Sequence, residues 1–165
     1  MSDIYLKISE GVDGDVTDEK YAKHVAVQSL STGMSNPSSV SVGTQAGSAG
    51  GGGKVIMQDV HFTKMCDKAS PKLWLKCAKG EHFKEFEFKY VLSRGDSSDV
   101  FKTVKLTDVL VTGFQHSGSS GSDLPMESIS LNFGKIEIGY KPRKAEGGWE
   151  GELKAGYDLK TAKPV

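Results

Sequence analysis

Apolar and polar residues alternate along several short stretches of the chain, with the two-residue period of half-buried β-strands. Ile4, Leu6 and Ile8 share one face of the first stretch, and the segments 86–92 and 135–140 alternate in the same way. Further stretches rich in β-branched and aromatic residues lie at 24–31, 54–64, 100–114 and 127–133. The pattern predicts an all-β domain with about seven or eight strands.

One short helix is predicted in the segment SPKLWLKCAKG. Ser70 is placed to cap it, Pro71 suits the first helical position, and Gly80 can end it in the left-handed conformation. Leu73 and Cys77 lie four residues apart and so share a face, with the tryptophan of the segment beside them. We therefore expect this helix to plug an open end of a compact β-barrel.

A glycine- and serine-rich segment at 33–54 interrupts the predicted strands. The chain of 165 residues has room for one domain, 1–165, so this segment lies inside the domain and joins no second one. It shows no apolar periodicity, and a structureless segment of this length inside a compact domain is usually functional or disordered. We predict an extended loop held by a neighbouring subunit, with a solvated loop as the alternative.

Charge and apolar content narrow the possible partners. The 21 basic side chains balance 21 acidic ones, so no long-range field favours nucleic acid or an anionic membrane surface. No apolar run approaches the roughly 20 residues that span a bilayer, and the start of the chain lacks the parts of a signal peptide. We expect a protein made in the cytoplasm, inserted in no membrane, and exported, if at all, without a cleaved signal peptide.

Candidate catalytic and cofactor sites fail on spacing. The segment 48–55 is glycine-rich, but a phosphate-binding loop needs glycine at Ser48 and a hydroxyl residue at Val55, followed by a helix. No serine stands in a Gly-x-Ser-x-Gly nucleophile elbow. The possible metal ligands lack the short spacing of a zinc site and are His61, Cys66, Asp67, Cys77 and His82. We predict no enzyme, no metal and no cofactor.

The remaining cysteine and histidine positions have ordinary interpretations. Cys66 and Cys77 are too few for a secreted disulfide framework, so we expect structural thiols. His24 and His116 stand apart from the other candidates, and we expect them at the surface or in an interface.

Several motifs follow one another in an order typical of one family. The chain opens with DIYLKI and a turn that contains GD, and continues through SLSTGMS into the glycine-rich loop. It then reads GKVIMQDVHFTKMCDKASPKLW, with FTK, DK and a Ser-Pro helix start in that order. Downstream come VLVTGF, a second glycine- and serine-rich loop, ESISLNF, GYKP and the tail GYDLKTAKPV. Over its whole length the chain resembles the Hcp (haemolysin-coregulated protein) family, the tube subunits of the type VI secretion system.

The resemblance implies a compact β-barrel with one helix, six copies of which form a hexameric ring around a wide channel. Rings stack into a tube inside a contractile sheath, carry a spike protein of the valine-glycine repeat family, and are secreted with effector proteins in the channel. Ser31 would line the channel and contact effectors, and the family has no catalytic residue to transfer. The segment 33–54 would pack on the adjacent subunit, with candidate contacts at Gly33, Met34, Val40, Val42, Gly50, Gly51, Gly52 and Gly53.

Three other classes of protein stay open at this point. A phage-like tail-tube protein would share the ring and the tube and differ in its sheath and spike. A small-molecule-binding β-barrel would need a ligand cavity and would be stable as a monomer. A catalytic secreted effector is the third. A mass measured under native conditions separates the tube proteins from the last two classes, because only the tube proteins form a ring of six.

Overall fold

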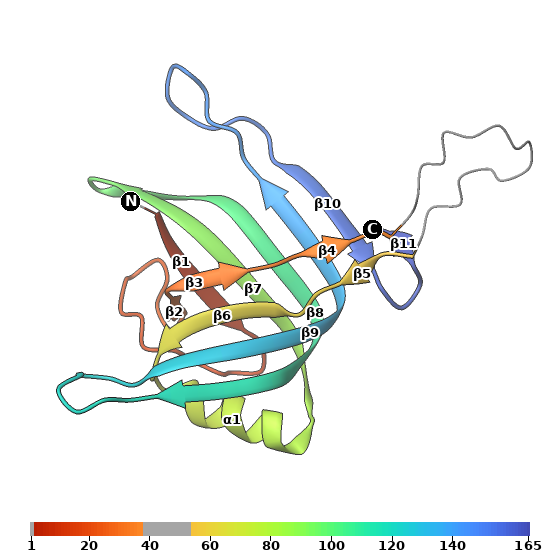
Figure 1. The fold of residues 1–165 in the computed structure, drawn as a ribbon. Helices are drawn as coiled ribbons and strands as arrows, with labels where there is room; N and C mark the ends of the chain where they lie inside the picture. Colours follow the sequence, from red (N-terminus) through yellow and green to blue (C-terminus); the bar gives the residue numbers. More distant parts are fainter. Residues whose placement is uncertain (1, 38–53) are drawn as a thin grey trace, which may run out of the picture.

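The computed structural model describes residues 2–37 and 54–165, which form a β-rich unit with a single short helix (Figure 1). The strands before the helix are β1 (Ser2–Ile8), β2 (Val25–Val27), β3 (Ser29–Ser31), β4 (Met34–Ser35), β5 (Ile56–Met57) and β6 (Val60–Met65). After helix α1 (Ser70–Lys79) come β7 (His82–Arg94), β8 (Ser97–Ser117), β9 (Met126–Tyr140), β10 (Leu153–Asp158) and β11 (Lys163–Pro164). The predicted fold class, all-β with one short helix, is confirmed.

The main sheet curves until strand β2, at one end, reaches strand β3, which branches from β9 through β6. Antiparallel pairing runs in the order β10, β9, β8, β7, β1 and β2, while β9 also pairs with β6 and β6 pairs with β3. Only Gln28 separates β2 from β3, and its amide donates to the Thr63 carbonyl oxygen of β6 at 2.8 Å. The hydrogen-bonded ladder is therefore not closed, but one continuous piece of chain joins its ends and completes a compact barrel.

Strand β9 changes its partner halfway along. Its first half pairs with β6, and its second half, from Lys135, pairs with β10. The buried residues Phe133 and Ile136 are three positions apart, whereas inward-facing residues of a regular strand are two apart. The inward-facing positions therefore shift by one residue at Gly134. Gly134 lies beside Asp108 of β8, which has a φ of 57°. The sequence predicted two strands here, and they are one because this irregularity absorbs the shift.

The barrel is filled by aromatic and branched side chains from six strands. Phe62, Phe86 and Phe88 are fully buried, and the rings of Phe62 and Phe88 meet edge to face with centroids 5.4 Å apart. Fully buried Leu6 of β1 and Leu106 of β8 complete this layer. A side chain of this size stabilises the fold by about 1.5–3 kcal/mol when buried.

Helix α1 covers one end of the barrel, as predicted, but differs in two details. Leu73 is fully buried and Cys77 packs against the core, whereas Trp74 is 54% exposed and faces away from it. Gly80 ends the helix with a φ of 67°, as expected. Ser70 was expected as the cap, but the cap is Ala69 and Ser70 is the first helical residue, because its hydroxyl is engaged elsewhere.

Residues 9–24, here called the strap, contain no strand and connect β1 to β2. Val12, Tyr21 and His24 of the strap are buried, at 5%, 3% and 8% exposure. The expectation that His24 lies at the surface or in an interface is therefore wrong for the single subunit. The isolated histidine gave no periodic signal, since the strap reaches the core without regular secondary structure.

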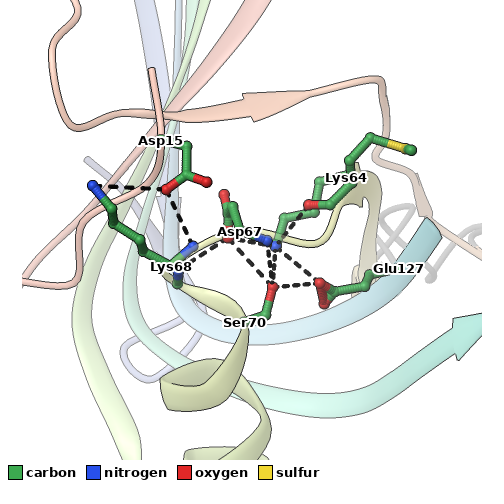
Figure 2. Close-up of polar contacts among 8 residues, drawn as sticks. Asp15, Lys64, Asp67, Lys68, Ser70 and Glu127 are labelled. Atoms are coloured by element: carbon green, nitrogen blue, oxygen red, sulfur yellow. Dashed lines mark hydrogen bonds and ion pairs between the residues drawn. The ribbon is translucent and has the colours of Figure 1, made fainter. Parts of the chain in front are cut away.

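A buried ion pair joins α1 to the sheet (Figure 2). Lys64 of β6 is completely buried and points from the inner face, in register with Val60 and Phe62. Its ammonium group donates to Asp67 Oδ1 at 2.7 Å and to Glu127 Oε1 of β9 at 3.3 Å. These residues and Ser70 are called the Lys64 cluster.

Ser70 connects the two carboxylates of the Lys64 cluster. Its hydroxyl oxygen accepts from Lys64 Nζ at 2.8 Å and from the Asp67 amide at 3.0 Å, and its proton goes to Glu127 Oε1. Asp67 Oδ1 also accepts from the Ala69 amide at 3.0 Å, which holds the start of α1. Figure 2 shows these groups converging at the start of the helix, beside Ser70. The cluster thus joins β6, β9 and α1 at the covered end of the barrel.

Removing the cation of the Lys64 cluster should be costly. Lys64→Met leaves the buried Glu127 carboxylate without its counter-charge, and the free energy of unfolding should fall by about 3–5 kcal/mol. Lys105→Met, which breaks an exposed pair with Glu85, should cost less than about 1 kcal/mol. Urea unfolding followed by circular dichroism measures both. Equal small losses in the two variants would mean that the cluster does not hold the fold.

Candidate assembly surfaces

The described ends of the predicted loop form an arm that leaves the barrel. In this arm, residues 33–37 and 54–58, Met34 pairs with Met57 and Ser35 with Ile56. The Gln58 amide donates to the Gly33 carbonyl oxygen at 3.0 Å, which extends the pairing toward the barrel. Figure 1 shows β4 and β5 running out on the side of β10. The other predicted contacts lie outside the described residues: Val40, Val42, Gly50, Gly51, Gly52 and Gly53.

The arm presents large apolar side chains to solvent. Met34 is 59% exposed and Ile56 is 55% exposed, although neither has a polar group that water could satisfy. The two side chains lie on opposite faces of the two-stranded arm, because Met34 is opposite Met57 and Ile56 is opposite Ser35. They gain little stability from the arm itself, since an isolated hairpin is at best marginally stable in water. Within the described chain, the arm therefore lacks the cover that its side chains require.

An apolar cleft of about 290 Å³ opens at the base of the arm. One wall is formed by Met34, Val55 and Met57 of the arm, and the other by Ile138 of β9 with Ala155 and Tyr157 of β10. The cleft exists because β9 leaves β6 at Gly134 and turns to β10, so that the arm and the β9–β10 pair diverge.

The apolar stripe of the cleft runs from the core to the surface. Ile136 is 6% exposed and belongs to the core, and Ile138 packs against it. Farther along the same pair of strands, Tyr140 and Leu153 face each other and are 46% and 66% exposed. Exposed apolar patches that continue a core commonly mark contact surfaces. The described subunit thus ends in an uncovered apolar face beside a projecting apolar arm.

A second apolar surface lies at the covered end of the barrel. Trp74, Pro71 and Phe114 line a cavity of about 240 Å³ between α1 and the end of the β8–β9 pair. Exposed apolar side chains continue around it at Leu75, Leu124 and Met126. In Figure 1 this end, marked by α1, lies away from the arm. The two apolar surfaces are therefore separate.

Ser31 lies on an exposed face that carries hydroxyl and imidazole groups. It is opposite His61 of β6, which is in turn opposite Ser130 of β9 and hydrogen-bonds its hydroxyl at 2.8 Å. The next row contains Ser29, Thr63 and Ser128. Leu30, between the two serines of β3, packs against the core instead. The face around Ser31 is thus polar and carries no carboxylate or ammonium group in these two rows.

The candidate metal ligands do not meet in space. Asp67 belongs to the Lys64 cluster, and His61 contacts Ser130. Cys66 and Cys77 are free, half-buried thiols. His82 Nδ1 contacts Asp108 Oδ1 at 2.8 Å, and hydrogen bonds from Lys160 and then from His82 hold the pKa of that carboxyl below its usual value. In the described ranges, no group of three or more His, Cys, Asp and Glu side chains could hold a metal ion.

None of the helical structure in residues 2–37 and 54–165 is long and apolar enough to cross a membrane. The described helix α1 has ten residues and carries three lysines, at 72, 76 and 79.

Comparison with known proteins identifies one family from both the fold and the sequence motifs. The model of the family described as type VI secretion system effector, Hcp, matches residues 5–140. Protein hcp1 of Pseudomonas aeruginosa is 33% identical over 108 residues, which cover 65% of this chain and 67% of that protein. This matched range of the family model includes the Lys64 cluster, Ser31 and both strands of the arm.

Solved structures agree over the full length. A structure described as a type six secretion system protein superposes with a TM-score of 0.89 at 32% identity and covers 100% of both chains. The crystal structure of Hcp1 from Salmonella typhimurium superposes with a TM-score of 0.76 at 29% identity and covers 99% of both. The predicted resemblance is confirmed: this chain belongs to the Hcp family of type VI secretion system effectors.

Proposed function

We propose that this Hcp protein works by assembly, as one of six subunits of a ring whose copies stack into the tube of the type VI secretion system. The observation that carries the proposal is the apolar arm beside an apolar cleft that the same subunit leaves open. Catalysis plays no part in this function. The tube acts through its shape and through the surfaces that its subunits present.

The arm and the cleft suit a ring because they are different surfaces. A cyclic assembly needs a heterologous interface, in which one surface of a subunit meets another surface of the next. The arm of one subunit would lie against Tyr140 and Leu153 of the neighbour, which would bury Met34 or Ile56 on these residues and the other side chain on the opposite face of the arm. Each buried side chain would contribute about 1.5–3 kcal/mol. Gly33 and Met34 are thus contact residues of the interface in this proposal.

The polar face around Ser31 supports a channel wall. A wall that faces water needs exposed groups that stay solvated, and a face of hydroxyl groups without charges in its two rows would attract neither acidic nor basic effectors strongly. Effector proteins would bind there in the lumen of the stacked rings. The tube would end in a spike protein of the valine-glycine repeat family and lie inside a contractile sheath.

The proposed route of the protein follows from this function. The subunit is made in the cytoplasm, assembles there, and leaves the cell as part of the expelled tube without a cleaved signal peptide. A small-molecule-binding barrel fits less well, because the apolar cleft lies at the surface and one of its walls is the arm, whereas ligand sites usually enclose most of the ligand.

Negative charges on the arm should prevent the subunits from forming a ring. We expect a mass of six subunits for the unmodified protein in native mass spectrometry, and a shift toward monomers for Met34→Asp with Ile56→Asp. The barrel should stay folded, since both side chains are more than half exposed. Leu124→Asp, a matched change at the other end, should keep the ring. A monomer for the unmodified protein, or an intact ring in the double variant, would contradict the proposed interface.

The apolar end at α1 should serve stacking and not ring closure. Trp74→Ser removes a half-exposed aromatic side chain from that end, so it should leave rings of six intact and reduce their association into longer tubes. Lys72→Ser on the same helix is the control and should stack normally. Sedimentation velocity at increasing protein concentration measures the association. Normal stacking of Trp74→Ser would move the contact between rings elsewhere.

A charge at Ser31 should affect cargo alone. Ser31→Glu places a carboxylate on an exposed face, where it stays solvated, so rings should form as before. Retention of an effector in a co-purification assay should fall several-fold, while Ser31→Ala, which adds no charge, should retain it. Loss of the ring in Ser31→Glu would place Ser31 in a packed interface, and unchanged retention would place the cargo contact elsewhere.

A further inference from the structure

The strap holds His24 as a neutral imidazole. Its Nδ1 lies 3.2 Å from the Ala22 carbonyl oxygen, and because a carbonyl only accepts, Nδ1 carries the proton. Its Nε2 lies 3.4 Å from the ammonium group of Lys89 on β7 and accepts from it. A second proton on the ring would have to sit at Nε2, directly against this cation.

The side chains around the ring offer no negative charge that would stabilise a second proton. Lys7 of β1 adds a second positive charge, and Tyr21 meets the ring edge-on with centroids 5.7 Å apart. Tyr5 of β1 stacks on Tyr21 at 4.9 Å. Across the described chain, no carboxylate is hydrogen-bonded to His24 or paired with it. Burial is the largest effect and holds the pKa of His24 below its usual value, and the charges of Lys89 and Lys7 lower it further. Hydrogen bonds with the Ala22 and Tyr21 backbone oppose this shift, and the Ala22 effect is larger than that of either lysine.

His24 also closes the strap. The Val16 amide donates to the His24 carbonyl oxygen at 3.2 Å, and the Gly14 amide donates to the Lys23 carbonyl oxygen at 2.8 Å. A Cβ at Gly14 would lie 2.4 Å from the His24 carbonyl oxygen, so the two parts of the strap touch at backbone distance. Movement of His24 would therefore break both of these backbone hydrogen bonds.

The strap contains one sign of incomplete packing. Tyr21 is 3% exposed, and its hydroxyl is buried without a hydrogen-bond partner. A buried hydroxyl that lacks a partner regains hydrogen bonds with water when it is exposed. Opening the strap would therefore return this hydroxyl to water, which offsets part of the cost of opening.

We propose that protonation of His24 opens the strap, residues 9–24, while the barrel stays folded. In the open strap the ring is solvated and takes a proton with the ordinary pKa of about 6.5. The closed strap takes it only at lower pH. Below about pH 6.5 the open form therefore gains a proton that the closed form lacks, and closure weakens as the pH falls. Above that pH the histidine is neutral in both forms and does not oppose closure. This inference does not depend on the proposed ring.

Hydrogen exchange followed by mass spectrometry tests the proposal on the full chain. After correction for intrinsic exchange rates, protection of the amides in 13–24 should fall on the order of tenfold from pH 7 to pH 5. Protection of β7 should not change. His24→Asn can still donate to the Ala22 carbonyl oxygen but cannot take a proton, so its strap should show no such loss. His116→Asn, at an exposed histidine, should behave like the unmodified protein.

Two further variants keep the test decisive if His24→Asn does not fold. Lys89→Gln removes the cation nearest to Nε2, so the closed strap should accept a proton more easily and lose less protection at pH 5. Lys105→Gln on β8 is the control and should lose as much as the unmodified protein. The proposal is overturned by equal strap protection at pH 7 and pH 5, by equal loss in His24→Asn, by simultaneous loss in β7, or by an unchanged loss in Lys89→Gln.

Discussion

A fully buried lysine needs negative charge beside it, and this requirement organises one end of the molecule. The Lys64 ammonium group is removed from water, so an unpaired cation there would cost several kcal/mol. Asp67 comes from the segment that leads into α1, and Glu127 comes from β9. Ser70 joins them from the first turn of the helix. The helix can therefore start only where β6 and β9 are paired in the correct register, which ties local structure to the sheet.

The pairing of β6 with the first half of β9 determines which apolar surfaces stay exposed elsewhere in the molecule. While β6 holds the first half of β9 at the Lys64 cluster, the second half turns at Gly134 and carries its apolar face out to β10. The same chain that enters β6 comes from the arm, so the arm and the uncovered stripe diverge from one region of the sheet. The surfaces that we assign to ring formation are thus consequences of how β9 divides between two partners. Assembly, in this account, completes a core that the single subunit leaves unfinished.

Much of this structure could be read from the sequence, and the failures have physical causes. Alternation located most strands, and the residues suited to helix ends located the helix, which ends at Gly80 in the left-handed conformation. Alternation did not find β10, because LKAGYD mixes small and polar residues and lies in an exposed strand. The motifs FTK and ESISLNF identified the family, but the contact between Lys64 and Glu127 was missed. A signal was present: each charge falls on the apolar face of its strand, in step with Phe62 or Ile129. The exposure of Ser31 needed the pairing of β3 with β6.

The measurement that most directly tests the central claim is an electron cryo-microscopy map of the purified protein at side-chain resolution. We expect a ring of six subunits in which the arm of each subunit lies against Tyr140 and Leu153 of the next subunit, with Ser31 facing the channel. Single barrels, or rings in which the arm and the apolar stripe both stay in contact with solvent, would contradict it.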